Sequence, residues 1–572
     1  MHLGLPTRSV HGLPIIEHAE FGRNVPDEAM PDEDKMNLGK IYHMGKEEAA
    51  ELLLNRQAMA SHTFITGSTG TGKSNAVYHL LDEITKNGQT TFLVVEPAKG
   101  EYKNVFGNCT DAQVFGTNPR ETPLLRMNPF AFPENIHILE HIDRLVEIFN
   151  ACWPMYAAMP AVLKDAIERS YQKVGWDLRN SESEKGIFPT FFDLLDILPG
   201  VIEESHYSKD TQSDYVGALC TRVKSLTNGI YGSVLCAEDA LSDAEMFDQN
   251  VIVDLSRVGS METKSLLMGI LVMKLQEYRM CSSGMNSRLR HVTVLEEAHN
   301  LLRKTSAEQS QEGANLQGKS VEMLANAIAE MRTYGEGFII ADQAPGLLDM
   351  SVIRNTNTKI ILRLPDEEDR KLVGKSAALK EAQIDELSKL PLGVAAVYQN
   401  EWPEAVLCKI EAYPMPENAV YHKPSKMPHE INAEFVFGQL AVGKELEPLS
   451  SSEMEQLKLW LKRHETVLKP EDSRYLERVF AGGELDVAKT RKAVFDFFGG
   501  ISTVVDYCAA AEKSLTPRKE FLEQLQGQYG LKAAAADWVL NSVISMGMSL
   551  NPDAKAVDNL RTNFEQQGGR VL

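Results

Sequence analysis

The sequence lacks the features that mark secreted proteins, membrane proteins and proteins stabilised by a structural metal. Seven cysteines occur among 572 residues and none forms a CxxC pair, which argues against a disulfide framework or a structural zinc site. No apolar run approaches the ~18 residues of a membrane span. The N-terminus, MHLGLPTRSVHG, has no apolar core of a signal peptide. We therefore expect a cytoplasmic protein with reduced thiols.

A net positive charge is also absent. The chain carries 59 Lys and Arg against 80 Asp and Glu, for a formal net charge of -21. This argues against a surface coated for general nucleic-acid binding but does not exclude a local basic channel, because phosphate contacts depend on local Lys and Arg residues. Hydrophobic residues make up 43% of the chain, as in ordinary globular proteins. The length predicts two to four domains at about 150 residues each.

Strand and helix patterns divide the chain into four parts. Residues 1–40 are punctuated by Pro and Gly, whereas residues 41–412 alternate strands with helices and predict an α/β domain with a mostly parallel sheet. Within this domain, helical spacing over about 120–245 predicts a helical insertion. Residues 413–430 are Pro-rich and predict a linker. Strand patterns then vanish, so residues 431–572 predict a helical C-terminal domain.

Seven short segments have the apolar pattern of buried strands. They are HTFITG (62–67), TTFLVVE (90–96), NVIVDLS (250–256), HVTVLEE (291–297), GFIIADQ (337–343), TKIILRL (358–364) and GVAAVYQ (393–399). The first two flank a helix pattern, and such a βαβ arrangement requires parallel strands. By contrast, KEEAAELLLNRQAMA, residues 46–60, is predicted to be helical from its helix-favouring residues.

A glycine-rich loop stands between the first predicted strand and its helix. GSTGTGKS, residues 67–74, matches G-x-x-x-x-G-K-[ST] at every fixed position. In such a loop, backbone N–H groups surround phosphate oxygens, while Lys73 reaches the β- and γ-phosphates and Ser74 binds Mg²⁺. The competing dinucleotide motif GxGxxG is absent here. We predict that the ATP-binding residues are Thr69, Gly70, Thr71, Gly72, Lys73, Ser74 and Asn75.

Two adjacent glutamates end the strand pattern in VTVLEEAHN, residues 292–300. Burying a carboxylate is costly unless it is paired or binds a metal. Beside a phosphate loop, one acid holds Mg²⁺ and the next orients the attacking water, so we assign Glu296 to the metal and Glu297 to the water. Because adjacent strand residues point to opposite faces, both roles require the strand to end here. The alternative is a pair of exposed acids at the start of a helix.

Two further segments and His299 place polar residues near this predicted site. FIIADQAP ends a strand pattern, and we predict that Gln343 contacts both the γ-phosphate and the attacking water. An ordinary strand-end turn is the alternative. EPAKGEYKNV, residues 96–105, supports the site, contacts a neighbouring subunit or forms a plain surface loop. His299 is either a site residue or a packed or helix-capping histidine.

Taken in order, these motifs are similar to those of the HerA–FtsK branch of P-loop ATPases, and to HerA most. The matching stretches are EFGRNV, FITGSTGTGKSNAV, VVEPAKGEY, NVIVDLSRVGSMETK, VTVLEEAHNLL, AEMRTYGEGFIIADQAP and NTNTKIILRL, which cover about residues 20–412. The resemblance implies a RecA-like fold of the additional-strand glutamate type and a hexameric ring with ATP between subunits. It also implies Mg²⁺-dependent movement along duplex DNA, with a nuclease or sirtuin-like effector protein in DNA end processing or antiphage defence.

The resemblance further implies that an arginine from the next subunit stabilises the γ-phosphate. Its position is Arg332, before Tyr-Gly, and Arg354 and Arg363 are second choices. Surface ion pairs or sheet-edge packing are the alternatives for each arginine. This chain departs from the family at Glu296 and Glu96, where the family usually or often has Asp, although the charge is kept.

Partner and DNA contacts are expected outside the segments that carry these motifs. HerA proteins carry an N-terminal β-barrel that docks partners, and residues 1–40 predict that it is reduced or absent here. We therefore expect partner binding by residues 431–572. The polar segment 303–320 is predicted either to face DNA in the pore or to form an interface loop. Two other functions stay open: a nucleotide-gated scaffold that regulates an effector, and a secretion or conjugation ATPase.

Overall fold

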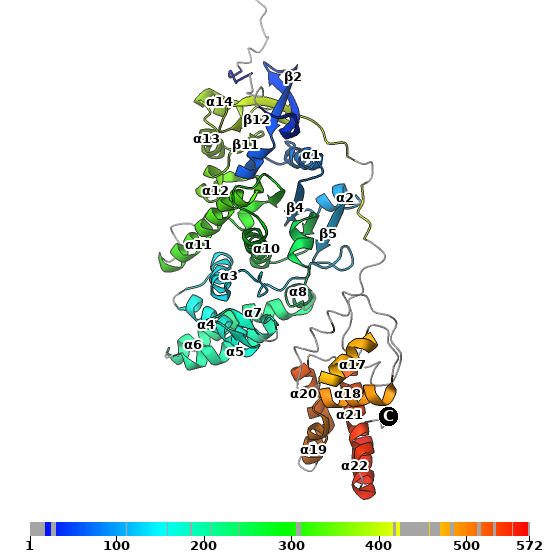
Figure 1. Ribbon diagram of the computed structural model, residues 1–572. Helices are drawn as coiled ribbons and strands as arrows, with labels where there is room; N and C mark the ends of the chain where they lie inside the picture. The colour runs from blue at the N-terminus through cyan, green and yellow to red at the C-terminus, as the bar shows by residue number, and fades with distance from the viewer. Residues whose placement is uncertain are drawn as a thin grey trace, which may run out of the picture. The chain divides into compact units, whose positions relative to one another are not determined.

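A computed structural model shows two compact units (Figure 1). Unit 1 comprises Met1–Tyr171, Leu178–Ser181 and Pro189–Lys423, and unit 2 comprises Gln172–Asp177, Glu182–Phe188 and Pro424–Leu572. The structure describes residues 18–23, 30–109, 111–156, 158–183, 186–205, 207–237, 240–304, 311–415, 419–423, 457, 470–480, 486–511, 516–529, 533–551 and 553–569. Each unit is described separately below.

Unit 1 is built around one sheet of eleven strands. Its strands are β1 (Lys35–His43), β2 (Lys46–Asn55), β3 (Thr63–Thr66), β4 (Thr91–Glu96), β5 (Ala112–Gly116), β8 (Asn250–Asp254), β9 (His291–Glu296), β10 (Glu336–Asp342), β11 (Thr358–Ile361), β12 (Val394–Gln399) and β13 (Val406–Ile410). Their order is β2-β1-β13-β12-β11-β3-β10-β9-β4-β8-β5. The run from β11 to β5 is parallel, and the remaining four strands are antiparallel. The predicted mostly parallel α/β sheet is confirmed.

The central strands are continuous apolar runs because helices cover both faces of the sheet. Every residue of β3, β9 and β10 is buried. Helix α1 (Lys73–Thr85) packs Ala76, Val77, Leu80, Leu81 and Ile84 into the core, at the spacing of one helix face. Helix α10 (Met261–Ser282) is buried along most of its length. All seven predicted strand segments coincide with observed strands.

The strand order decides where the site lies. β10 is inserted between β3, which carries the glycine-rich loop, and β9, which carries the glutamates. The register pairs Asp342 with Thr66 and Ala341 with Glu296. Because all three strands are parallel, their carboxyl ends meet at one edge of the sheet. This inserted strand is the feature expected of the additional-strand class.

The N-terminal part of unit 1 corrects two predictions. Residues 46–60 are not helical, because Lys46–Asn55 form β2, which pairs antiparallel with β1. Of its ten residues only Leu52 and Leu54 are buried, and cross-strand pairing here overrides the helix-favouring composition of KEEAA. The predicted boundary at residue 40 is also wrong, since β1 runs through it from Lys35 to His43.

Helices fill the chain between β5 and β8, the region predicted as a helical insertion (Figure 1). They are α3 (Ile138–Cys152), α4 (Met159–Lys173), α5 (Phe191–Glu204), α6 (Lys209–Tyr215), a π-helix (Val216–Cys220), α7 (Thr221–Thr227), α8 (Gly229–Leu235) and α9 (Asp243–Phe247). The small strands β6 (Trp176–Asp177) and β7 (Glu182–Ser183) pair with each other and belong to unit 2.

Further helices and turns complete the described part of unit 1. They are α2 (Tyr102–Phe106), α11 (Gln311–Glu330), α12 (Met350–Arg354), α13 (Glu367–Ser376) and α14 (Glu381–Glu386), with 3-10 turns at Asp32–Asp34, Gln57–Ser61, Ala298–Asn300, Met331–Tyr334 and Pro345–Leu347. Of the segment 303–320, residues 305–310 lie outside the described residues, and α11 begins directly after them.

The described part of the predicted linker, residues 413–430, is bonded to unit 1. The Tyr413 backbone N–H donates to Asn75 Oδ1 at 2.9 Å, and the Tyr421 backbone N–H donates to Asn104 Oδ1 at 3.0 Å. Asn108 Nδ2 donates to the Val420 carbonyl at 2.8 Å. The chain therefore runs along unit 1 as far as Lys423.

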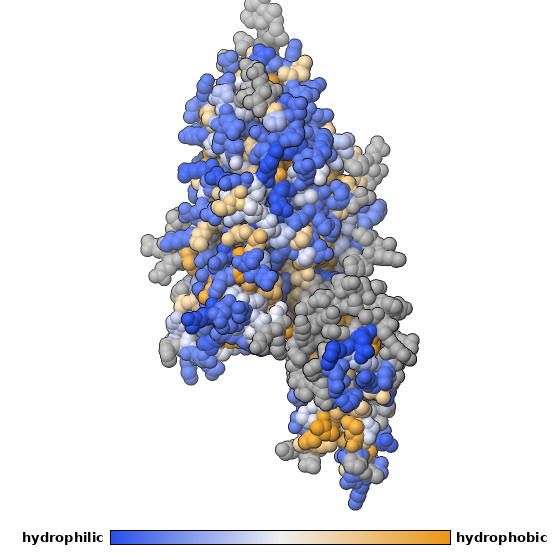
Figure 2. Space-filling view, viewed as in Figure 1, coloured by the Kyte–Doolittle hydropathy of each residue, from blue (hydrophilic) through white to orange (hydrophobic). Residues whose placement is uncertain are grey.

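In the described residues of unit 2, helices follow the small strand pair. Its helices are α17 (Pro470–Phe480), α18 (Val487–Phe497), α19 (Gly500–Ala511), α20 (Pro517–Tyr529), α21 (Ala533–Leu550) and α22 (Ala554–Gln566). Tyr507 and Phe564 are among its core residues. Helix α19 also exposes Ile501 and Val505, and Figure 2 shows an apolar area around this helix.

Within the described ranges, no single helix has the length and apolar character needed to cross a membrane. The helices Ala488–Phe497 and Gly500–Ala511 meet these criteria only as a pair, across a bend of 64°.

Candidate active site

The glycine-rich loop joins β3 to α1 at the centre of the sheet. Gly70 and Gly72 have φ angles of 75° and 105°, in the left-handed region that side chains disfavour. A Cβ at Gly67 would meet Leu362 Cβ and Thr71 Oγ1 at 2.7 Å each. Thr71 Oγ1 donates to the Ser68 carbonyl at 2.7 Å, so its hydroxyl braces the loop from inside. The glycines are thus required by the loop's shape.

A cavity of about 320 Å³ opens over this loop. It is lined by Ser68, Thr69, Gly70, Gly72, Lys73, Ser74, Asn75, Lys99, Gln343 and Leu392. The first turn of α1 faces it, and free N–H groups at a helix start attract anions. Of the predicted ATP-binding residues, Thr71 alone does not line the cavity. Asn75 lines it, but its amide also bonds the Glu411 carbonyl and the Tyr413 N–H.

Lys73 lies against both predicted catalytic acids. Its Nζ donates to Glu296 Oε2 at 2.8 Å and to Glu297 Oε1 at 3.3 Å. Burial alone lowers the pKa of Lys73, but the two carboxylates outweigh burial, so the pKa is raised. The lysine thus offsets the charge of the buried Glu296 and of the partly buried Glu297. Glu296 and the cavity-lining Ser74 supply oxygen atoms of the kind that Mg²⁺ prefers.

The end of β9 explains how two adjacent acids reach one lysine. β9 stops at Glu296, and Glu297 takes a left-handed conformation with φ 45° and ψ 52°. This conformation costs on the order of 1–3 kcal/mol in a non-glycine residue. The Glu297 carbonyl accepts the Asn300 backbone N–H at 2.9 Å and Asn300 Nδ2 at 2.7 Å, which holds the turn. The strand therefore ends between Glu296 and Glu297, as the separate metal and water roles predicted for them require.

Gln343 follows β10 and bridges the loop to Glu297. Its Nε2 donates to Glu297 Oε1, and its Oε1 accepts the Thr69 hydroxyl at 2.7 Å. One amide therefore contacts both the phosphate loop and the acid predicted to orient water. This is the geometry expected of a residue that reports on the γ-phosphate.

Tyr102 contacts the site although sequence reasoning did not select it. Its hydroxyl donates to Glu296 Oε1 at 2.5 Å, and burial raises the pKa of this phenol well above its ordinary value, so it keeps its proton. Glu96 positions the tyrosine by accepting the backbone N–H groups of Glu101 and Tyr102, at 2.8 and 3.1 Å. The motif EPAKGEY was the sequence signal that could have pointed to Tyr102. Of the three interpretations given for this segment, the bond from Tyr102 to Glu296 favours support of the site.

The position of Glu96 has an electrostatic consequence. Burial raises the pKa of Glu96 to about 8, against the effect of the two N–H groups and with that of Asp254 and Glu296. Lys103 bonds Asp254 instead, at 2.6 Å. Glu96 is therefore held largely in its protonated form at neutral pH.

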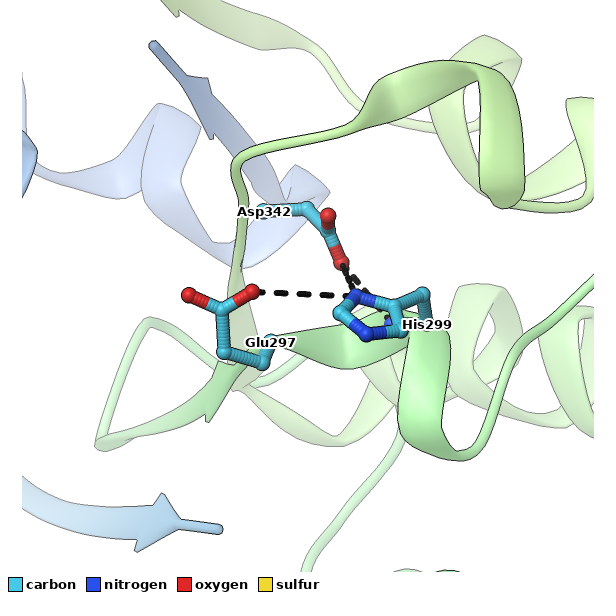
Figure 3. A group of neighbouring side chains, drawn as sticks. All are labelled: Glu297, His299 and Asp342. Carbon is cyan, nitrogen blue, oxygen red and sulfur yellow. Dashed lines mark hydrogen bonds and ion pairs between the residues drawn. The ribbon is translucent and has the colours of Figure 1, made fainter. Parts of the chain in front are cut away.

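His299 and Asp342 form a pair beside Glu297 (Figure 3). His299 Nδ1 lies 2.9 Å from Asp342 Oδ2, and the His299 backbone N–H donates to the same oxygen at 2.8 Å. His299 Nδ1 also lies 3.7 Å from Glu297 Oε2. The hydrogen bond to Asp342 raises the pKa of His299, although burial opposes it. Of the two interpretations of His299, the structure supports the site residue.

Most of these site residues lie in a segment that matches a known family. Residues 36–336 match the family model described as helicase HerA, central domain. This match spans more than half of the chain and includes the phosphate loop, both glutamates and His299. The chain belongs to the HerA helicase family.

Individual relatives agree with the HerA assignment. The DNA double-strand break repair helicase HerA of Sulfolobus acidocaldarius is 25% identical over 392 residues, covering 66% of this chain and 69% of that protein. A probable helicase of Methanocaldococcus jannaschii is 23% identical over 436 residues, covering 70% and 76%. The structure of VirB4 of Thermoanaerobacter pseudethanolicus has a TM-score of 0.50 at 17% identity, over 67% of this chain and 98% of that chain. That last likeness concerns the fold alone.

The three predicted arginines of this HerA-family chain lie outside the cluster formed by its own acids. Arg332 is exposed just before β10, and Arg354 is exposed at the end of α12, before β11. Both positions are at the amino ends of strands, away from the phosphate loop at the carboxyl ends. Arg363 follows β11, and its carbonyl accepts the Ser68 N–H at 3.0 Å, while its side chain is exposed.

Proposed function

We propose that this HerA-family protein is a ring-forming, Mg²⁺-dependent ATPase that translocates on or unwinds duplex DNA with an effector protein. The observation that carries the proposal is the convergence of Lys73, Glu296, Glu297 and Gln343 beside one cavity over a phosphate loop. Membership of the HerA family supports ATP hydrolysis coupled to DNA. We place the protein in the cytoplasm.

The geometry supports a division of labour among these residues. The loop N–H groups and Lys73 bind the β- and γ-phosphates, for which Lys73 must leave the two glutamates. Ser74 and Glu296 would hold Mg²⁺, which offsets phosphate charge when bound. Glu297 then accepts a hydrogen bond from the attacking water and draws its proton, while Gln343 fixes Glu297 and reaches the loop.

A ring completes this site in the proposal. Within one chain, Arg332 and Arg354 lie at the opposite ends of the strands from the loop, so they reach a phosphate only in a neighbouring subunit. Arg332 is our first choice, with Arg354 and Arg363 next, in a homohexamer. Exposed Arg303 and Lys304 precede α11, exposed Lys319 lies within it, and all three would meet DNA in the pore.

ATP hydrolysis with and without duplex DNA tests the proposal, beside Glu297→Gln. We expect DNA to stimulate the wild type, and Glu297→Gln to lose about a hundredfold or more in kcat, as for removal of a base and water-positioning group. Its affinity for an ATP analogue should persist, because Lys73 and the loop are untouched. Lys73→Ala should lose that affinity. A Glu297→Gln variant that hydrolyses ATP normally would overturn the catalytic assignment.

A second candidate function is a nucleotide-gated scaffold that assembles and regulates an effector, such as a nuclease or sirtuin-like protein. The apolar side chains of Ile501 and Val505, 58% and 59% exposed on α19, favour protein binding by the C-terminal domain, which we propose spans residues 431–572. Hydrolysis that responds only to a co-purifying protein favours the scaffold. Retention of that partner after deletion of residues 431–572 removes this domain as its docking site.

A further inference from the structure

The imidazole of His299 faces two carboxylates through one nitrogen (Figure 3). Nδ1 lies 2.9 Å from Asp342 Oδ2 and 3.7 Å from Glu297 Oε2. A ring nitrogen carries one proton and serves one acceptor well at a time. Nδ1 lies nearer to Asp342, and because a carboxylate oxygen only accepts, we assign the Nδ1 proton to that bond.

Asp342 keeps its bonds without the ring. Its Oδ2 accepts the His299 backbone N–H at 2.8 Å, and its Oδ1 accepts the Ala344 backbone N–H at 2.9 Å. Both bonds come from the main chain and are independent of the imidazole. The fully buried carboxylate is therefore satisfied whether or not Nδ1 donates to it.

Unlike Asp342, Glu297 would lack a donor once nucleotide is present. Its Oε1 accepts Lys73 Nζ and Gln343 Nε2, and its side chain is only 15% exposed. When phosphate takes Lys73, this carboxylate loses its cation while it stays largely out of water. A carboxylate in that state is costly unless another donor replaces the lysine. Oε2 faces His299 and is the oxygen free for such a donor.

We propose that His299 is a positioning residue whose Nδ1–H moves from Asp342 to Glu297 when Lys73 turns to the phosphates. The ring then holds Glu297 Oε2 and leaves Oε1 and Gln343 to face the attacking water. The bond from the His299 backbone N–H to Asp342 persists during this change, so only the side chain of His299 rotates. The raised pKa of His299 fits this role, because a cationic ring replaces the lost lysine charge. The charged groups facing the ring are Asp342, Glu297 and, with opposing effect, Arg303.

This inference rests on the proposed ATPase site, and kinetics of His299→Ala and His299→Asn test it. Asn places an amide N–H near the position of Nδ1, so it can donate to Glu297, whereas Ala cannot. We expect His299→Ala to lower kcat at least about tenfold, the value of one hydrogen bond to a charged group, with affinity for an ATP analogue within about twofold. His299→Asn should recover most of the loss.

A double-mutant cycle with Glu297 gives the decisive readout. If His299 acts through Glu297, adding His299→Ala to Glu297→Gln causes no further loss of the residual rate. Additive losses would overturn the inference, and so would a His299→Ala enzyme within about twofold of wild-type kcat. Equal impairment of the Ala and Asn variants with lowered melting temperatures would show a merely structural histidine. Normal hydrolysis by both Lys73→Ala and Glu297→Gln would instead refute the site itself.

Discussion

The two ends of β9 and β10 carry similar side chains for different purposes. At the amino ends, Glu336 accepts Arg279 Nε at 2.9 Å, His291 Nδ1 at 2.8 Å and the Thr293 hydroxyl at 2.8 Å, and all four residues are buried. At the carboxyl ends, Glu297 joins Lys73 and lies near His299 beside an open cavity. Both networks combine an acid, a histidine and a permanent cation.

What separates the two networks is access to other partners. The pKa of Glu336 is lowered because His291 and Arg279 outweigh the effect of burial, and the guanidinium is closed off from water. Lys73, at the carboxyl ends, lines a cavity with the features of a phosphate site, so a phosphate can replace the two glutamates as its partner. An ion-pair network therefore stabilises the fold where it is sealed, and serves chemistry where its ions have alternative partners.

The largest effect that follows is on stability, from Glu336→Gln. This change removes the buried carboxylate that Arg279 Nε and His291 Nδ1 share, while Asp248, 2.7 Å from Arg279 Nη1, still pairs the guanidinium, so we expect a loss of about 1–3 kcal/mol of unfolding free energy. Urea denaturation checks it, with the exposed Glu368→Gln as a matched control that leaves stability unchanged. Once folded, the variant should bind an ATP analogue normally. Unchanged stability would mean that the sealed network is not structural and would erase the contrast.

The next effect depends on pH and concerns Glu96, a carboxyl that accepts two main-chain N–H groups. Its pKa is raised from 4.5 to about 8, so the folded state keeps a proton that the unfolded chain releases. The unfolding free energy should therefore fall as pH rises from 4.5 to about 8, and Glu96→Gln should lack this component. Denaturation across this range checks it, with Glu101→Gln as control. Parallel curves for wild type and Glu96→Gln would contradict the assignment.

The smallest effect is expected at Lys99, an exchangeable cation at the rim of the cavity. Lys99 has a left-handed backbone, with φ 63°, and its Nζ lies 3.9 Å from Glu101 Oε2. Because the side chain is 48% exposed, Lys99→Gln should weaken ATP-analogue binding only about two- to fivefold. The loss should shrink at high salt. Lys86→Gln is the control, and an equal loss there would point to net charge rather than to position.

The sequence predicted the central sheet well because its strands are short, continuous apolar runs. It failed for β2, where helix-favouring residues occupy a strand at the edge of the sheet and burial marks only Leu52 and Leu54. In the site, Lys73, Glu296, Glu297 and Gln343 were found from motif spacing, and the structure places them in contact. Motif spacing was sufficient to identify these four residues because each lies at or just after the carboxyl end of one of three adjacent parallel strands.

Other parts of the site were beyond sequence reasoning because they depend on side-chain directions. The Tyr102 hydroxyl reaches Glu296 across 194 positions of the chain, and no periodicity encodes that contact. The His299 interpretation stayed open until its bond to Asp342 was seen. The arginine assignments remain predictions, since Arg332 and Arg354 lie at the amino ends of strands and Arg363 is bonded to the phosphate loop through its main-chain carbonyl.

Asn75 has a consequence for how the ATPase communicates. It directly follows Ser74 in α1, and its amide binds Glu411 and Tyr413, where the chain leaves the last strand of the sheet. One amide side chain thus connects the helix that begins at the nucleotide loop to the chain that follows β13. We therefore expect a rearrangement of the phosphate loop to alter these two bonds and, through them, the course of the chain at Glu411 and Tyr413.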